Sequence, residues 1–362
     1  MKFRPTDICL FLRRFRLGTA TMILVLAIAA LLFFRFMPGG GEFYATRIYP
    51  QLSAKLSYLS SLVGFSLDEI VAAVFLFKIL FTPLWGRWNG YSVGEVFRRE
   101  AMFIGWLFVW FYAGWGTNYY RDSFYQRTST EPLQYDSLAF RSFLDDYTRR
   151  LNASYCPVQD IDHDSAVDHI HDLFRNVPPE ARLAAPHSFQ RPKRLLFNRL
   201  YSSVGVLGFM GPFMCESHVN EQLFPSQYPF TYAHELSHLL GVSSEDEANF
   251  WAFYVCSHST RRAVRYSGYY GLLPYVAGNA AVALSVRDFE RWLETVRPEI
   301  RRQWQSEREF WQAQRSPLLD KAQTTLYNWF LKSNNVSSGI ASYNQVVRMI
   351  ISYRKSLSLH HE

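Results

Sequence analysis

The sequence contains few charged residues, 19% of its 362 positions, against 49% hydrophobic and 17% aromatic residues. Its mean hydropathy of −0.11 is nevertheless too low for a chain that crosses a membrane along its whole length. The apolar residues must therefore be concentrated in part of the chain. The length allows one large domain with an appendage.

The sequence also lacks a basic stripe, a disulfide framework and any internal repeat. Its basic residues give a formal net charge of +7 but are dispersed, and no nucleic-acid-binding module is present, so we expect no nucleic-acid partner. The four cysteines show no Cys-x-x-Cys spacing and are too few for a disulfide scaffold. One disulfide bond, outside any membrane, is a possible alternative. Free buried thiols are favoured at Cys9, Cys156, Cys215 and Cys256.

The first apolar stretch follows a basic N-terminus and runs without a charge from residue 17 to 34. It is long enough to cross about 30 Å of hydrocarbon, and we predict a transmembrane helix at about 17–36. A secretory signal peptide is the competing interpretation. The apolar run is too long for a signal core, and residues 33–38 form a poor cleavage site, so the helix is favoured.

Two further transmembrane helices are predicted at about 67–85 and 101–117, with an interfacial segment at 44–62. The second is the weaker, because two acidic residues begin it and Lys78 and Pro83 interrupt it. We expect Lys78 to extend its amino group toward the end of that helix.

Basic residues between the predicted helices indicate the topology. Arg87, Arg98 and Arg99 lie between the second and third, whereas the first loop has only Arg47 and Lys55. The positive-inside rule then places the N-terminus in the cytoplasm and residues 119–362 outside it.

An HExxH motif, His234-Glu235-Leu236-Ser237-His238, lies in the part of the chain with ordinary globular composition. Residues four apart lie on one face of a helix, so both imidazoles can bind one metal ion while Glu235 acts on a water molecule. Zinc suits these donors, although other divalent ions bind them too. The competing interpretation is a pair of surface histidines on an amphipathic helix.

The residues after the motif supply a third ligand. Gly241 has the position of a glycine that ends a helix, and Ser244 that of an N-cap with Glu247 as capping-box partner. Glu245 then lies on the face toward the metal, and we predict it as the third ligand. Asn249, one turn on, is predicted to hydrogen-bond a ligand histidine.

An HExxH motif followed by a Glu-x-x-Ala-Asn helix resembles the gluzincin metallopeptidases, in which that glutamate is the third zinc ligand. Most of the chain is also similar to the DUF3810 family of bacterial membrane proteins. The likeness is carried by residues 115–119, 208–213, 216–220, 229–231, 234–238, 245–250, 265–269, 331–334 and 342–343.

This resemblance implies an α+β, mostly helical fold: N-terminal transmembrane helices (1–118), then a zincin-like metallopeptidase domain (119–362) outside the bacterial plasma membrane. In gluzincins a strand before the motif pairs with the substrate, which here implies residues 210–220 as that strand. The substrate-binding residues that it implies are Phe209, Gly211, Glu216 and Asn220.

A tyrosine or histidine from a later helix binds the substrate oxyanion in related enzymes. Tyr266, in the run RYSGY, is the first candidate here, and Tyr269 and His258 are the alternatives.

Two functions of different classes fit the sequence. The first is a membrane-anchored zinc peptidase acting on a peptide or protein, with Glu235 as general base. The second is a non-catalytic envelope module stabilised by zinc. Glu235 favours the enzyme, because a structural zinc site does not need that acid. Intramembrane proteolysis is disfavoured, because polar loops flank the motif.

Other elements follow from periodicity. His163, His169 and His171 lie in an acidic, helical segment, where a solvated helix face is favoured over a second metal site. A buried helix is predicted at 272–284. The remaining predictions are helices at 137–151, 286–314 and 318–354, the last divided at 333–338, and a hairpin or two edge strands at 195–209 and 212–220.

Overall fold

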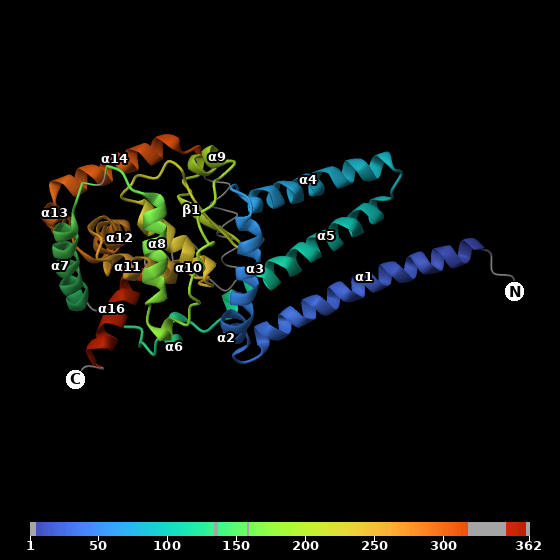
Figure 1. The fold of residues 1–362 in the computed structure, drawn as a ribbon, viewed down its shortest axis with the longest axis horizontal. Helices are drawn as coiled ribbons and strands as arrows, with labels where there is room; N and C mark the ends of the chain where they lie inside the picture. Colours follow the sequence, from blue (N-terminus) through green and yellow to red (C-terminus); the bar gives the residue numbers. More distant parts are fainter. Residues whose placement is uncertain (1–4, 134–136, 158, 318–344, 360–362) are drawn as a thin grey trace.

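Three long helices project from a mostly helical body in the computed structural model, which describes residues 5–133, 137–157, 159–317 and 345–359 (Figure 1). These helices are α1 (Pro5–Phe36), α4 (Leu67–Trp88) and α5 (Val93–Gly114), and they correspond to the three predicted apolar helices. The serines that precede α4 and α5 cap them, accepting hydrogen bonds from the backbone of Glu69 and Glu95.

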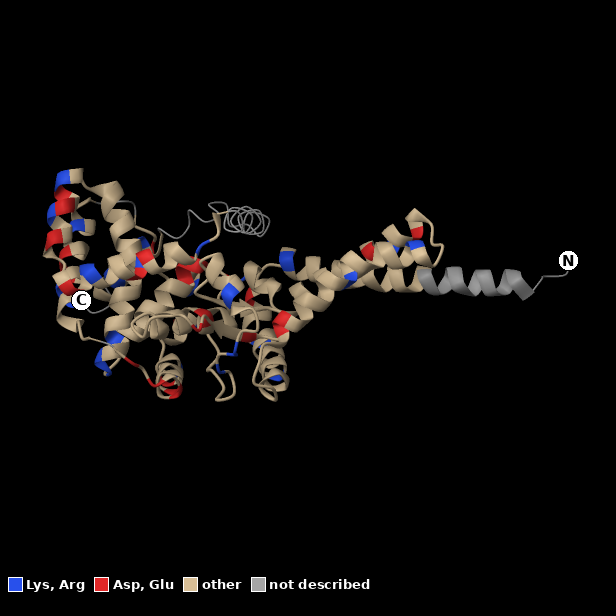
Figure 2. Ribbon diagram, turned by 90° about the horizontal axis from the view of Figure 1, so that it is seen from above, with Lys and Arg blue, Asp and Glu red and all other residues tan. Residues whose placement is uncertain are grey.

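Within the described residues, one helical segment is long and apolar enough by composition to cross a membrane: Gly18–Phe36, with a mean hydropathy of 2.2. Charges interrupt α4 and α5. The amino group of Lys78 lies 3.5 Å from the centroid of the Phe103 ring, so it packs on α5 and does not extend to the helix end. Figure 2 shows that most charged residues lie on the body.

A short helical segment crosses the body where the three helices emerge (Figure 1). It consists of α2 (Gly40–Phe43), η1 (Tyr44–Ile48) and α3 (Tyr49–Ser61). Helix α3 buries the serine face formed by Ser53, Ser57 and Ser60, and it exposes Tyr58 and Leu59. Leu59 therefore points away from the protein, whereas the exposed ring of Tyr58 packs edge-on against Phe189.

The body is organised around α11 (Glu245–Ser257), in which 10 of 13 residues are buried. Helix α11 packs between α10 (Tyr228–Leu239) and α12 (Arg262–Ala283). Gly268 and Gly271 of α12 allow this close packing, because a Cβ at either position would collide with Cys256 or Phe230. Helix α12 includes the predicted buried helix. Around this centre lie α7 (Ser137–Ser154), α8 (His163–Arg175) and α16 (Gln345–Leu359).

The segment from α2 to α3, the residue after α5 and the body share one hydrophobic core. Tyr44, Tyr49 and Trp115 are buried in the same cluster as the residues of α10, α11 and α12. Short elements connect the two regions: η2 (Gly116–Tyr120), α6 (Phe124–Arg127) and η3 (Pro179–Ala181).

Two short strands form an antiparallel hairpin over α10. They are β1 (Gly208–Gly211) and β2 (Glu216–Val219), with Gly208 opposite Val219. The predicted hairpin is confirmed in this part, but residues 198–203 form helix α9 (Asn198–Ser203), so the predicted strand is wrong there. Lys193 bridges the outer side of β2, which leaves β1 as the edge strand of the described sheet.

The predicted helix at 286–314 is two helices, α13 (Val286–Thr295) and α14 (Pro298–Gln314). Pro298 separates them, because proline lacks the amide that a continuous helix needs and instead suits a first turn. The predictions for residues 318–344 lie outside the described residues, while α16 is helical as predicted.

The three histidines of α8 contact different partners. His163 stacks on Tyr228, and His169 Nε2 lies 2.7 Å from Ser259 Oγ. His171 Nε2 lies 2.6 Å from the hydroxyl of Tyr232. Among the described residues these histidines share no metal site, and His171 is buried, contrary to the solvated face that we predict from the sequence.

This burial makes stability depend on pH. Burial, and then the charge of Arg175, lower the pKa of His171 to about 4. Its pKa in an unfolded chain is about 6.5, so between these values the unfolded state binds more protons. We expect the free energy of unfolding to fall as pH decreases from about 6.5 to about 4. His171→Gln should flatten that part of a thermal-denaturation profile, whereas His163→Gln, an exposed control on the same helix, should keep it. A profile unchanged by His171→Gln would contradict this assignment.

Candidate metal centre

Helix α10 presents both histidines of the motif on one face. His234 and His238 are four residues apart, and their Nε2 atoms lie 3.1 Å from each other. The helix begins with Pro229 in its first turn, where a missing amide is tolerated. The two imidazoles therefore converge as the spacing predicts.

Gly241 ends α10 in a Schellman turn. Its φ of 94° is in the left-handed region, and the amides of Gly241 and Val242 donate to the carbonyls of His238 and Ser237, both at 3.0 Å. The turn also brings the Val242 carbonyl back over the helix, where it lies 2.7 Å from His238 Nδ1. The helix end thus fixes the orientation of His238.

Helix α11 starts with Glu245, four residues after Gly241. Ser244 is its N-cap and accepts a hydrogen bond from the Glu247 amide, as predicted. Glu245 Oε2 lies 3.2 Å from His234 Nε2 and 3.6 Å from His238 Nε2. The structure therefore brings the predicted third ligand to both histidines.

The spacing of these three atoms fits a zinc ion. Zinc bound tetrahedrally at about 2.0–2.1 Å separates its ligand atoms by about 3.3 Å. The three distances here, 3.1, 3.2 and 3.6 Å, bracket that value. His234, His238 and Glu245 can thus hold such an ion with little rearrangement.

Hydrogen bonds select the tautomer of both histidines. Asn249 Oδ1 lies 2.9 Å from His234 Nδ1, the contact predicted for Asn249. Because Asn249 Oδ1 and the Val242 carbonyl are acceptors, each Nδ1 carries the proton and donates it. In each histidine Nε2 is then the ring nitrogen that faces Glu245.

Glu235 lies beside this cluster in a space that a glycine leaves open. It is 5% exposed, and its ligand atom lies within 4.8 Å of those of both histidines. A Cβ at Gly208 of β1 would come within 2.8 Å of Glu235 Oε1. Among the described residues, the Glu235 carboxylate forms no hydrogen bond or ion pair. It is a buried acid without a structural partner.

The local charges act on these groups in opposite directions. Burial raises the pKa of Glu235 above its ordinary value. Burial lowers the pKa of His238, but the Glu245 carboxylate outweighs it and raises the value to about 9. Burial raises the pKa of Glu245, but the two histidines outweigh it and hold the value well below its ordinary range. The neighbouring imidazoles therefore hold Glu245 as an anion, and a divalent cation would stabilise it in the same way.

Residues of α3 and of the segment that follows α5 contact the end of α10. The Trp115 indole donates to the His238 carbonyl at 3.0 Å, and the Tyr49 hydroxyl donates to the Leu239 carbonyl at 2.8 Å. Burial, and then the Glu245 carboxylate, raise the pKa of Tyr119. Helix α3 and the residues that follow α5 thus form one wall of the site.

The structure does not bring the candidate oxyanion donors to the cluster. The Tyr266 hydroxyl donates to Gln303 at 2.9 Å, on the other side of α12. Tyr269 and His258 line a separate cavity of about 520 Å³ between α7, α11, α12 and α16.

Tyr275 occupies the position that we expect for Tyr266. Burial, and then the charge of Glu245, raise the pKa of Tyr275, which indicates that its hydroxyl lies near the carboxylates of the cluster. Nine residues separate it from Tyr266, and at about 100° per residue they lie on opposite faces of α12. Which of the two tyrosines faces the cluster therefore depends on how α12 is rotated about its axis, and the sequence does not reveal this rotation.

The four residues that were predicted to bind the substrate have other contacts in the structure. Phe209 stacks between Tyr201 and His218. Asn220 joins Ser202 and the Val206 carbonyl in a buried loop network. Gly211 packs against the Asp68 carboxylate of α4.

Glu216 of β2 has a structural role, because its side chain binds the first turn of α4. Its buried carboxylate accepts hydrogen bonds from the amides of Leu67 and Asp68, at 3.1 and 2.9 Å, and from Ser60. His218 Nε2 lies 3.3 Å away. Burial raises the pKa of Glu216, but these contacts outweigh it and lower the value to about 2. Its prediction as a substrate-binding residue is therefore not supported by its position.

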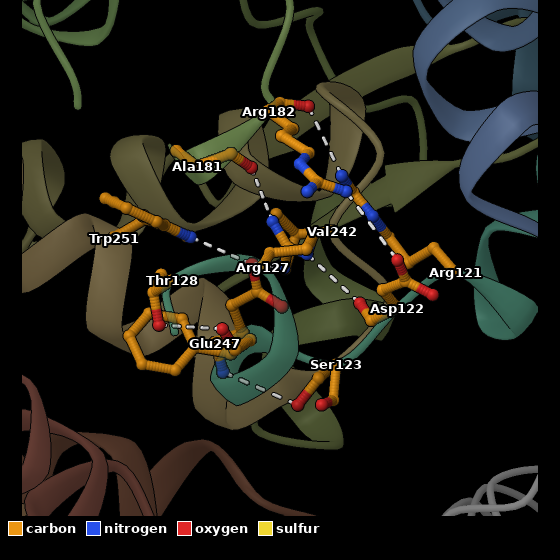
Figure 3. A network of polar contacts seen from close by, with 12 residues as sticks. Arg121, Asp122, Ser123, Arg127, Thr128, Ala181, Arg182, Val242, Glu247 and Trp251 are labelled. Carbon is orange, nitrogen blue, oxygen red and sulfur yellow. Dashed lines mark hydrogen bonds and ion pairs between the residues drawn. The ribbon is translucent and has the colours of Figure 1, made fainter. Parts of the chain in front are cut away.

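Glu247 is not a capping-box partner, contrary to the sequence prediction. Its carboxylate pairs with the buried Arg127, which also donates to the Ala181 carbonyl (Figure 3). The Trp251 indole donates to the same carboxylate at 2.9 Å. This buried network fixes the register of α11, and thereby the position of Glu245.

These features define a class: a mostly helical protein with a His-Glu-His-Glu cluster on two adjoining helices and an apolar N-terminal helix. The chain belongs to the DUF3810 family, described as proteins of unknown function, whose sequence model matches residues 44–351. No curated protein and no solved structure matches it significantly.

The two glutamates that open α11 should differ in their effects. Glu245→Ala removes a ligand, and we expect the purified full-length protein to lose most of its bound zinc. Glu247→Ala should keep the zinc but lose about 3–5 kcal/mol of stability, because the buried charge of Arg127 loses its carboxylate partner. Elemental analysis and thermal unfolding in detergent measure both effects.

The double variant Arg127→Met/Glu247→Leu is the control for Glu247→Ala. It should recover much of the lost stability, because it removes both charges. Loss of zinc from Glu247→Ala at a temperature where the protein stays folded would contradict the ligand assignment.

Proposed function

We propose that this protein is a membrane-anchored, zinc-dependent peptidase whose body is a zincin-like domain of the gluzincin type. The observation that carries the proposal is the Glu235 carboxylate, buried beside the three candidate ligands without a structural partner among the described residues. Glu216 and Glu247 are equally buried, but each is paired by several donors. An acid left unpaired at such a place is available for proton transfer.

Each residue then has a separate role. His234, His238 and Glu245 would hold a zinc ion, which when bound supplies a Lewis acid that activates water and polarises a carbonyl. Glu235 accepts the proton of the attacking water and passes it to the leaving amine. Asn249 keeps the His234 ring in position, and Tyr275 is the tyrosine whose location favours contact with the substrate carbonyl oxygen.

The substrate-binding element is the main chain of β1. The Asn220 amide donates to the Leu207 carbonyl, and the Ser217 carbonyl faces Lys193 on the outer side of β2. In an antiparallel pair these directions alternate, so the backbone groups of Gly208 and Met210 point away from β2. An extended peptide paired with this edge passes Glu235, which favours a polypeptide as substrate.

The projecting helices support a membrane location. Many of their apolar side chains are exposed, including Leu26 on α1, Phe77 on α4 and Phe97 on α5. The basic residues Arg87 and Arg98 lie near the end of the α4–α5 hairpin that is farther from the body (Figure 1). We propose that all three helices cross the plasma membrane and that the body lies outside the cytoplasm.

A zinc-stabilised, non-catalytic envelope module is the second candidate function. It explains the three ligands and the tautomers of the histidines equally well. It gives no role to Glu235, which a structural site does not require.

Replacing Glu235 separates these two functions. Glu235→Gln keeps the size of the side chain but cannot accept a proton. We expect unchanged zinc content and melting temperature, and at least about a hundredfold lower turnover of an internally quenched peptide library. His234→Ala should instead lose zinc and stability.

Glu290→Gln is the matched control, because this exposed glutamate lies on α13, outside the cluster. It should behave as wild type. If wild-type protein loaded with zinc cleaves no peptide, or if Glu235→Gln cleaves as fast as wild type, the peptidase proposal fails.

Topology is tested independently. A phosphatase that is active only outside the cytoplasm, fused after Glu362, should be active, because three spans from a cytoplasmic N-terminus leave the C-terminus outside. A β-galactosidase fused at the same place should be inactive. The reverse pattern would mean that α4 and α5 do not each cross the membrane.

A further inference from the structure

The metal centre lies directly at the base of the projecting helices. Trp115 is the residue that ends α5, and its indole hydrogen-bonds the carbonyl of His238 itself. The rings of these two residues are 6.5 Å apart. The site is therefore in direct contact with the end of a proposed transmembrane helix.

Strand β1 runs from the site to the base of the projecting helix α4. At one end Gly208 packs on Glu235, and at the other Gly211 packs on Asp68 in the first turn of α4. Three residues of extended chain span about 10 Å. A substrate that follows the edge of β1 thus runs between the catalytic glutamate and the start of α4.

The turn after β1 is inserted between α4 and α5. The ring of Phe213 packs against Phe75 of α4 and Trp110 of α5, and the Trp110 indole donates to the Phe213 carbonyl at 3.2 Å. The hairpin that forms one side of the site is therefore fixed to the membrane helices by its tip.

Exposed apolar side chains surround this region on the same side of the body. They lie on α3 and the loop after it, and on and just before α9, both next to the base of α4 (Figure 1). Together they continue the apolar surface of the projecting helices, which argues that the bilayer surface covers them. This membrane-facing patch consists of Tyr58, Leu59, Leu62, Phe65, Leu196, Phe197 and Leu200.

We infer that the substrate is a polypeptide tethered to the same membrane and cleaved close to the bilayer surface. The inference rests on the proposed peptidase function and names its substrate class. A chain held in the bilayer at one end is presented to β1 at high local concentration, whereas the interior of a soluble protein must first reach the membrane surface. The free strand edge favours a polypeptide over an amide-linked lipid, because it pairs with an extended main chain.

The test uses the full-length protein in vesicles of phosphatidylethanolamine and phosphatidylglycerol, loaded with zinc. A short segment that the quenched library shows to be cleaved is joined to the transmembrane helix of a single-pass model protein. In the short-linker substrate the segment follows the helix almost directly. In the long-linker substrate a flexible Gly/Ser linker lets it move away from the bilayer by roughly 25–30 Å on average. The same segment is also supplied as a soluble peptide.

The rates should depend on the linker. We expect the short-linker substrate to be cleaved at least about tenfold faster than the long-linker substrate, because only the former is held at the height of β1. It should also be cleaved faster than the soluble peptide at equal bulk concentration.

A second variant tests the role of the membrane-facing patch. Leu59→Ser/Leu62→Ser should slow cleavage of the short-linker substrate about fivefold or more, and leave soluble-peptide cleavage in detergent unchanged. Val282→Ser/Val286→Ser is the matched control, because both valines are exposed and lie at the junction of α12 and α13, outside the membrane-facing patch. It should change neither rate.

The outcomes separate the two proposals. Equal, Glu235-dependent cleavage of the short-linker and long-linker substrates would overturn the tethered-substrate inference alone. No Glu235-dependent cleavage of any polypeptide would overturn the peptidase proposal. An N-acyl phosphatidylethanolamine included in the vesicles tests the alternative: its hydrolysis without peptide cleavage would show a lipid amidase.

Discussion

The reversal of the chain at Gly241 is the constraint on which the site depends. A φ of 94° is readily adopted only by glycine, and it lets α10 end in two Schellman hydrogen bonds. The same turn directs the Val242 carbonyl to His238 and starts α11 so that Glu245 faces both histidines. A side chain at Gly241 would also press on the ring of Tyr49, so this position connects α10 and α11 to α3.

Three buried glutamates show how the fold separates structural from chemical roles. Arg127 neutralises Glu247, and a helix N-terminus with its flanking hydroxyl groups neutralises Glu216. In both cases the environment satisfies the carboxylate and lowers its pKa. Glu235 is different: burial raises its pKa, and the described residues offer it no donor. Among these three glutamates, only Glu235 combines burial with a raised proton affinity.

Local spacing predicted most of the candidate centre, because the centre is built almost entirely from two adjoining helices. The contact from Asn249 to His234 needs only the turn between them and one helical repeat. Long-range packing decided what the sequence could not predict. Arg127 is 120 residues from its partner, the role of Glu216 exists only once α4 docks, and the choice of Tyr275 over its helix neighbour depends on how α12 is rotated. The apolar helices were predictable as elements, since composition alone defines them, but their junction with the body was not.

That junction has a consequence for how the protein exists in a cell. The start of α4 supplies Glu216 with its backbone donors, and Asp68 in turn accepts hydrogen bonds from the amides of Phe213 and Met214. A chain cut after Asn118 would lose these partners together with Tyr49 and Trp115, and would keep a buried carboxylate with too few donors. Removal of residues 1–118 by proteolysis would therefore destabilise the remaining body. If the projecting helices cross a membrane as proposed, the part of the chain that carries the site would stay attached to that membrane.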